Sequence, residues 1–212
     1  MSSPDSQYQA ILFDFDGVLV DSEPVHFDCW SEILRPFGIT LEWEYYAANC
    51  IGVSDRAMIA TLAPLAEPPV EFDTLYAQYP NKKSLFRERM LVNPPIPADT
   101  LRLLDELRDF PLGLVTSSGQ SEVAPILERL GIRDRFAAQV YGGDVARLKP
   151  APDPYLRAAE LLGVTRALVI EDSEAGIAAG TAAGFDVVRI ATPNEVAAKV
   201  RAALSLETAN RS

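Results

Sequence analysis

The sequence predicts an α/β fold, in which a doubly wound parallel sheet carries a small all-helical domain inserted after its first strand. Two patterns support this prediction. Short apolar runs suited to strands buried on both faces alternate with helical stretches. A stretch of about 70 residues after the first run shows helical periodicity and no convincing strand. We therefore place an α/β core domain at 1–19 and 93–212, and a helical domain at 20–92.

The strands of the sheet are expected at five apolar runs. Nearly continuous apolar segments between helices are typical of a Rossmann-like core, because strands of a parallel sheet are covered on both faces. The runs are Gln9–Phe15, Leu112–Thr116, Ala137–Tyr141, Ala167–Ile170 and Asp186–Ile190.

The helices between the later runs have clear boundaries. Asp153, followed by a proline, begins one helix, and Gly163 ends it. Ser173 can cap the next helix and Gly184 can stop it. The residues between them are rich in Ala and Gly, which suits close approach of the helix to the sheet.

In the inserted domain, apolar side chains recur at the spacing of one helical turn. A proline-rich segment at 93–97 is expected to return the chain to the core. For the basic cluster of Lys82, Lys83 and Arg87, beside Asn81, we expect a solvated helix face. The periodic positions are Val25, Cys29, Ile33 and Phe37, then Ala57, Thr61 and Leu65.

Composition excludes several classes of protein. The formal net charge of −11 argues against nucleic-acid binding, which depends on Lys and Arg contacting phosphates. No apolar run has the roughly 18–20 residues that span a bilayer, and the N-terminus does not resemble a secretory signal. We expect a cytoplasmic monomer. An acidic chain that handles an anionic substrate needs local positive charge, which a divalent cation would supply.

Asp14 and Asp16 follow the first apolar run and should share one face of an extended chain. Two close carboxylates repel each other unless one is protonated or a cation lies between them. Gly17 then permits a turn. Acids of an ordinary turn remain an alternative. A calcium-binding loop is disfavoured, because apolar residues surround the pair.

Three further segments end predicted strands with polar side chains. Thr116 and Ser117 could cradle a phosphate with a hydroxyl and backbone N–H groups, although a helix cap would use the same residues. Lys149 precedes a proline-framed loop and could neutralise a phosphoryl oxygen, or it could be a surface lysine. Glu171 and Asp172 offer oxygen ligands to Mg²⁺, or they favour a helix dipole. Their shared position at strand ends favours one site.

Together these segments resemble the haloacid dehalogenase-like superfamily, in particular the branch that contains β-phosphoglucomutase and small sugar-phosphate phosphatases. The resemblance spans Ala10 to about Ile190, with the helical insertion where that branch carries its cap domain. The motifs in order are Asp14–Ser22, Val115–Ser118, Lys149–Asp153 and Glu171–Gly176.

The resemblance implies a role for each strand-end residue. Asp14 would be the nucleophile that forms an aspartyl-phosphate, and Asp16 the general acid/base. The Mg²⁺ cofactor would be held by Asp14, the backbone carbonyl of Asp16, and Asp172, with Glu171 bound to the ion or beside it.

The remaining core residues would contact the phosphoryl group. Thr116 and the Ser117 amide would hold phosphoryl oxygens, and Lys149 would orient them and neutralise their charge.

In the cap, His26 stands where β-phosphoglucomutases carry a hinge histidine, although a lone histidine on a helix face explains it as well. Gly52, Val53 and Ser54 resemble the substrate-specificity loop. Mutases place an arginine directly after that serine, but this chain has Asp55 there and an arginine, Arg56, one residue later.

An acid at this position would repel a second phosphate. We therefore expect an Mg²⁺-dependent phosphatase that hydrolyses a small phosphorylated metabolite, a sugar or polyol phosphate. The alternative is a β-phosphoglucomutase-type mutase. A third possibility, of another class, is a non-catalytic phosphate-sensing module, which would be expected to lack one of the acids.

Overall fold

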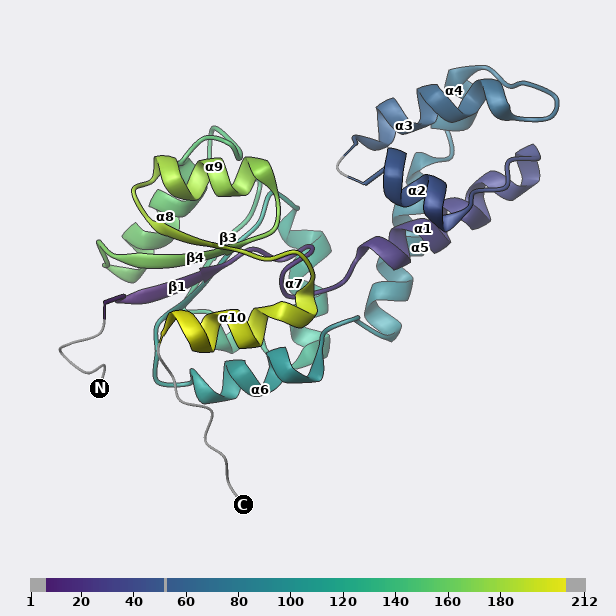
Figure 1. Ribbon diagram of the computed structural model, residues 1–212. Helices are drawn as coiled ribbons and strands as arrows, with labels where there is room; N and C mark the ends of the chain where they lie inside the picture. The colour runs from purple at the N-terminus through teal and green to yellow at the C-terminus, as the bar shows by residue number, and fades with distance from the viewer. Residues whose placement is uncertain (1–6, 52, 205–212) are drawn as a thin grey trace. The chain divides into compact units, whose positions relative to one another are not determined.

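The computed structural model describes residues 7–51 and 53–204 (Figure 1). By their internal contacts the residues form two compact units. The core unit comprises the described residues up to Asp21 and from Pro94 onward, and the cap unit is Ser22–Asn93. We propose that these units are the two domains expected at 1–19 with 93–212 and at 20–92.

The core unit is built on a five-stranded sheet in which all neighbouring strands are parallel. The strand order is β3-β2-β1-β4-β5, which confirms the predicted doubly wound α/β fold. The strands are β1 Ala10–Phe13, β2 Leu112–Val115, β3 Ala138–Val140, β4 Ala167–Glu171 and β5 Asp186–Arg189.

The register of the central strands brings two motifs together. Phe13 pairs with Ile170 of β4, and the N–H of Asp14 donates to the Ile170 carbonyl at 3.1 Å. Strand β1 ends at Phe13, two residues before the end of the predicted run Gln9–Phe15. This register places Asp14 beside the next residue of β4, Glu171.

Helices cover both faces of the sheet. In Figure 1, α8 and α9 lie on one face, and α6 and α10 lie on the other. The predicted boundaries are confirmed, because Gly163 closes α8 in the left-handed conformation and the Ser173 hydroxyl accepts from the Gly176 N–H at the start of α9. The helices are α6 Ala98–Glu106, α7 Gln120–Leu130, α8 Asp153–Leu162, α9 Glu174–Ala182 and α10 Val196–Ala203.

The described residues of the cap unit form helices and no strand, as predicted. Their buried side chains include Trp30, Leu34, Ile59, Leu62 and Leu75, which make a separate apolar core. The helices are α1 Glu23–Leu34, α2 Trp43–Asn49, α3 Asp55–Leu62, α4 Phe72–Tyr76 and α5 Tyr79–Val92, with short 3₁₀ turns at Arg35–Phe37 and Ala63–Leu65.

The helix predicted from the periodic positions Ala57, Thr61 and Leu65 is present as α3, but these residues do not form its buried face. Ala57, Thr61 and Leu65 are exposed, whereas Met58 and Ile59 are buried together with Leu62. A helix turns inward the face that removes the most apolar area from water. Met, Ile and Leu side chains bury more apolar area than an Ala–Thr pair, so they decide the orientation.

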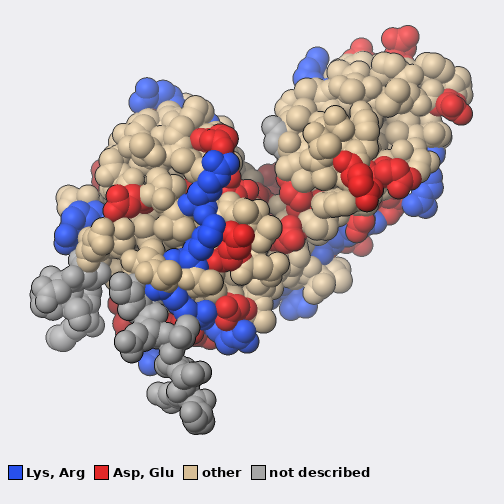
Figure 2. All heavy atoms as spheres, viewed as in Figure 1, with Lys and Arg blue, Asp and Glu red and all other residues tan. Residues whose placement is uncertain are grey.

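Charged side chains of both signs mix on the surface. On the face shown in Figure 2, acidic side chains border the stripe of basic side chains on the core unit. Several basic residues of the core unit are paired with acids, for example Lys199 with Glu195 at 2.7 Å and Arg201 with Glu106 at 2.8 Å. Within the described ranges, every helix is too short or too polar to cross a membrane.

The close approach of α9 to the sheet depends on a small residue. A Cβ at Gly180 would lie 2.9 Å from Val187 Cγ2 and 3.1 Å from Val169 Cγ1. Gly180→Leu should therefore lower the free energy of unfolding by about 1–3 kcal/mol through overpacking.

Ala178→Leu, at an exposed position of the same helix, is the matched control and should change stability by no more than about 0.5 kcal/mol. Urea denaturation followed by circular dichroism measures both variants. Equal losses in the two variants would contradict the close packing of α9 on the sheet.

Candidate active site

The candidate site lies where β1, β2 and β4 end, at the edge of the sheet where open α/β folds bind ligands. Asp14 is the first residue after β1, and its side chain is 12% exposed. Its carboxylate has one fixed partner of opposite charge, because the Lys149 ammonium donates to Asp14 Oδ1 at 2.5 Å. The ammonium itself is almost entirely buried, with 5% of the side chain exposed.

Three acceptors surround the Lys149 ammonium. Besides Asp14, it donates to the Val115 carbonyl at 3.0 Å and to Glu171 Oε1 at 2.6 Å. A lysine ammonium has three N–H donors, so each donor has an acceptor. The side chain is thus held at the ends of β1, β2 and β4 at once, and the alternative of a surface lysine is wrong.

Glu171 is completely buried and both of its oxygens are occupied. Oε1 also accepts from the Tyr155 hydroxyl at 2.7 Å. Oε2 accepts from the N–H groups of Asp172 and Ser173 and from the Ser173 hydroxyl, at 3.1–3.2 Å. A carboxylate with this many donors has little capacity left to bind an ion directly.

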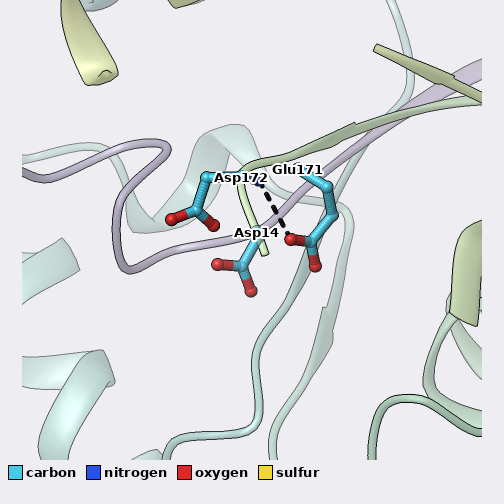
Figure 3. A group of neighbouring side chains, drawn as sticks. All are labelled: Asp14, Glu171 and Asp172. Carbon is cyan, nitrogen blue, oxygen red and sulfur yellow. Dashed lines mark hydrogen bonds between the residues drawn. The ribbon is translucent and has the colours of Figure 1, made fainter. Parts of the chain in front are cut away.

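Three carboxylates lie close enough to one another to surround a metal ion. Asp14, Glu171 and Asp172 each offer an oxygen, and these oxygens lie within 4.8 Å of one another. Figure 3 shows the three side chains converging beside the end of β1. Gly17 makes room for them, because a Cβ there would overlap Asp172 Oδ2. Asp16 contributes no side-chain oxygen to this group, and the metal-ligand role of its backbone carbonyl stays a prediction.

The electrostatics of the group favour a cation. Burial is the main cause that raises the pKa of Asp14 to about 8; the charge of Lys149 opposes this shift, and the charges of Glu171 and Asp16 add to it. Burial, followed by the charge of Glu171, raises the pKa of Asp172 to about 6. The pKa of Lys149 is also raised, since burial is outweighed by its two carboxylate partners. Oxygen donors with unbalanced negative charge match the preferences of Mg²⁺.

Three hydroxyl-bearing residues follow β2, and their role toward a phosphate stays a prediction. Thr116 is buried, and its Oγ1 accepts from the Ser118 N–H at 3.0 Å, whereas Ser117 is exposed. The Ser118 hydroxyl donates to Asp16 Oδ2 at 3.0 Å. This bond joins the loop after β2 to the loop after β1, so both predicted motifs belong to one cluster of side chains.

Sequence reasoning missed Tyr155 and Ser118. Tyr155 lies three and four residues before Ala158 and Ala159 in α8, so the three side chains share the buried face of the helix. This spacing predicts a core residue and gives no sign of a role in the site. Ser118 stands beside Thr116 in a serine-rich turn where any hydroxyl could act as a cap. The available signal for Tyr155 was its hydroxyl, because a polar group at a buried helix position needs a hydrogen-bond partner.

The cap unit contains a buried cation. Lys82 is 2% exposed, and its ammonium lies 2.7 Å from His26 Nδ1 and 3.5 Å from Asp55 Oδ1. Because a protonated lysine only donates, Nδ1 must accept and the histidine proton belongs on Nε2. The Trp30 indole N–H donates to the same Asp55 oxygen at 2.9 Å. The His26 ring stacks on Phe86, with centroids 4.0 Å apart.

One expectation for the cap changes. Lys82 does not belong to a solvated helix face, although Asn81, Lys83 and Arg87 are exposed as expected. A lysine on a helix turns inward when a carboxylate and aromatic rings can surround its ammonium, as Asp55 does here together with Trp30. Burial lowers the pKa of Lys82, and Asp55 partly offsets this effect.

The residues of the expected specificity loop are only partly described. Gly52 lies outside the described residues. Val53 is exposed, and the Ser54 hydroxyl caps α3 by accepting from the Ala57 N–H. The guanidinium of Arg56 lies over the rings of Phe72 and Tyr76, 4.8 and 5.2 Å from their centroids. Substrate contact by these residues therefore stays a prediction.

The fold and the site define an α/β enzyme that gathers acids and one lysine at the ends of parallel strands. The sequence profile of the haloacid dehalogenase-like hydrolases matches residues 11–190. The chain belongs to this family, as the four motifs predict.

Relatives with assigned activities are similar over most of their length. A fructose-1-phosphate phosphatase from Escherichia coli is 31% identical, over 87% of this chain and 97% of its own. A β-phosphoglucomutase from Bacillus subtilis is 30% identical, over 86% and 83%. The structure of a hydrolase of this superfamily from Geobacter sulfurreducens, 22% identical, has a TM-score of 0.76 over 92% of this chain and 98% of that one.

Metal binding should depend on pH in the direction set by the carboxyl pKa values. Asp14 and Asp172 ionise in the folded, ion-free chain near pH 8 and pH 6, above their ordinary value of 3.8. Their ionisation therefore destabilises the fold as the pH rises through this range, and a bound cation opposes that loss. Mg²⁺ should raise the thermal midpoint more at pH 8.5 than at pH 5.5.

Differential scanning calorimetry with and without Mg²⁺ measures this shift. Asp172→Asn should remove most of the shift at pH 8.5, whereas Asp109→Asn, at an exposed site, should keep it. A stabilisation by Mg²⁺ that is independent of pH, or that survives Asp172→Asn, would contradict the assignment of the ion to these carboxylates.

Proposed function

We propose that the chain is an Mg²⁺-dependent phosphatase that hydrolyses a small phosphorylated metabolite, a sugar or polyol phosphate, through an aspartyl-phosphate at Asp14. One observation carries the proposal. Asp14 lies at the end of β1, bonded to a buried lysine and next to the carboxylate of Asp172. This arrangement supplies a nucleophile with the positive charge that lets it approach an anionic substrate.

The first step transfers the phosphoryl group to the enzyme. A carboxylate oxygen of Asp14 attacks phosphorus, and the bond from phosphorus to the leaving oxygen breaks on the opposite side. Asp16 gives its proton to the leaving oxygen, which departs as an alcohol. The hydrogen bond from Ser118 to Asp16 Oδ2 orients this carboxyl group for the proton transfer.

The second step releases phosphate. A water molecule attacks the phosphorus of the aspartyl-phosphate, and its proton passes to Asp16. The bond from phosphorus to the Asp14 oxygen breaks, and the free carboxylate is restored. Thr116, the Ser117 amide and Lys149 are the proposed partners of the phosphoryl oxygens in both steps. Thr116 and Ser117 follow β2, and the Lys149 ammonium bonds to residues at the ends of β1, β2 and β4.

The donor set fits a magnesium ion. Asp14 and Asp172 would hold it, because Glu171 is already occupied by hydrogen bonds and a salt bridge. When bound, Mg²⁺ supplies positive charge that neutralises a phosphoryl oxygen. The role we propose for Glu171 is to fix Lys149 rather than to bind the ion.

The cap unit favours water over a second sugar phosphate as the acceptor. A mutase must hold a bisphosphate in both orientations and therefore needs cations that are available to a second phosphate. In the cap unit, the charge of Lys82 is paired with Asp55, and Arg56 is held over two aromatic rings. We propose that this pairing excludes a second phosphate and that hydrolysis is the main reaction.

The relatives support the chemical class of the substrate but do not decide the reaction. The Escherichia coli relative acts on fructose 1-phosphate, and the Bacillus subtilis relative is a mutase; their identities to this chain are 31% and 30%. A small carbohydrate phosphate is the class common to both. The pairing of Lys82 with Asp55 is the observation that favours hydrolysis.

Replacing the nucleophile should abolish turnover. The chain should release phosphate from an aryl phosphate and from fructose 1-phosphate only with Mg²⁺ present. Asp14→Asn should lower kcat by at least about 10³-fold, as the loss of a catalytic nucleophile does in other enzymes. A colorimetric phosphate assay, with Asp109→Asn as the control, measures this.

Phosphate release that survives both EDTA and Asp14→Asn would contradict the mechanism. A wild-type chain that binds inorganic phosphate tightly but turns over no phosphate ester would favour a phosphate-sensing module instead.

Asp55 should control access of a second phosphate. Asp55→Asn keeps an acceptor for the Trp30 indole but removes the negative charge beside Lys82. Inhibition by glucose 1,6-bisphosphate should strengthen about tenfold in this variant, which corresponds to about 1.4 kcal/mol. The KM for fructose 1-phosphate should change less, and Asp73→Asn, an exposed acid of the same unit, should change neither.

The choice between hydrolase and mutase has its own measurement. The wild-type chain is given β-glucose 1-phosphate with a trace of the bisphosphate, and both products are followed by enzymatic assay. Free phosphate should form faster than glucose 6-phosphate. The reverse order would overturn the preference for hydrolysis.

A further inference from the structure

Tyr155 is a core residue whose hydroxyl makes a hydrogen bond to a site residue, Glu171. It is 0% exposed in α8 and packs among apolar side chains that include Val140, Ala158 and Val169. Its hydroxyl donates to Glu171 Oε1 at 2.7 Å. Phenylalanine would fill the same apolar space without having to satisfy a buried hydroxyl, so packing alone gives no reason for a tyrosine here. We therefore look for the role of the hydroxyl in its hydrogen bond to Glu171.

Glu171 is fixed at both ends of its carboxylate. At Oε2, donors from its own loop hold it: the N–H of Asp172 and the N–H and hydroxyl of Ser173. At Oε1, the donors are the Lys149 ammonium and the Tyr155 hydroxyl. Without the hydroxyl, the Lys149 ammonium would be the one donor at Oε1, and the carboxylate could rotate about its Oε2 contacts.

The space behind the carboxylate is also closed. Gly176, in the first turn of α9, lies against Glu171, and a Cβ at this position would overlap Oε1. The carboxylate thus lies between the start of α9 and the hydroxyl of α8. Its place is therefore set by residues of two helices of the core unit, Tyr155 of α8 and Gly176 of α9.

The position of Glu171 determines that of Lys149. Of the three acceptors of the ammonium, the Val115 carbonyl and Glu171 Oε1 belong to β2 and β4, and Asp14 is the third. The Tyr155 ring also covers the ammonium, with its centroid 5.1 Å from Nζ. A shift of Oε1 would therefore move the charge that faces the nucleophile.

We propose that Tyr155 is a positioning residue for phosphoryl transfer, whose hydroxyl acts through Glu171 to hold the Lys149 ammonium against Asp14. The inference rests on the proposed function, because it takes Asp14 as the reacting group. Tyr155 is buried, and its hydroxyl bonds to Glu171 rather than to Asp14, so it acts through another residue.

The experiment is a double-mutant cycle of Tyr155→Phe and Lys149→Met. Tyr155→Phe removes one oxygen and keeps the ring. It should lower kcat for fructose 1-phosphate about tenfold, the lower end of the range for partners that orient an active-site group, with little change in KM. In the Lys149→Met chain, the same substitution should cause no further loss, because nothing remains to be positioned.

Tyr141→Phe is the matched control. Tyr141 is a buried tyrosine of the same unit whose hydroxyl donates to Gln139 Oε1 at 2.7 Å, so its loss removes an equivalent hydrogen bond. This variant should lose similar stability by thermal denaturation but keep the wild-type kcat. Equal kcat losses from Tyr155→Phe with and without Lys149, or an unchanged kcat in the single variant, would overturn the positioning role.

A binding measurement separates this inference from the proposed function. Orthovanadate mimics the transferring phosphoryl group, so its affinity reports the position of Lys149 without turnover. Isothermal titration calorimetry with Mg²⁺ should show weaker binding, about tenfold, in Tyr155→Phe, and no further weakening when Lys149 is already Met. Failure of this pattern overturns the inference.

The proposed function has a different point of failure. A wild-type chain that binds vanadate but releases no phosphate from any ester would contradict the proposed function, while the vanadate cycle would still decide the role of Tyr155. A chain that neither binds vanadate nor releases phosphate would overturn both.

Discussion

The crowding of negative charge where β1 and β4 end is the constraint on which the rest of the core depends. The in-register pairing of Phe13 with Ile170 puts Asp14 and Glu171 next to each other, out of water. Two ionised carboxylates in such a place are stable only with a positive charge between them. Lys149 supplies it, with its Nζ 2.5 Å from one carboxylate and 2.6 Å from the other.

Much of this arrangement could be predicted from the sequence, because it depends on local patterns. Apolar runs that end in Asp14 or Glu171 predict strand ends, and parallel strands bring their carboxyl ends to one edge. The partners of those residues depend on tertiary packing instead. Tyr155 and Lys82 both lie inside helices, where the pattern suggests only core or solvent. The direction in which each of these side chains points depends on an acid from a distant segment, Glu171 for Tyr155 and Asp55 for Lys82. A local sequence pattern therefore cannot predict it.

The two units treat buried charge differently. In the core unit, the lysine is outnumbered by carboxylates, and the site keeps an excess of negative charge that attracts a cation. In the cap unit, Lys82 is paired with Asp55, and the rings of Trp30 and Phe86 lie beside its ammonium. The first arrangement suits chemistry on a phosphoryl group.

The separation of the site residues along the chain has a consequence for biosynthesis. Lys149 is 135 residues from Asp14 in sequence, although the two side chains are in contact. Contacts this distant must wait for most of the chain, and folds rich in them form slowly. While the protein is made on the ribosome, Asp14 emerges early and stays hydrated, because the strand and the lysine that would bury it do not yet exist. The unfinished chain therefore carries no assembled site, and a chain cut short before β4 would lack Glu171 and Asp172.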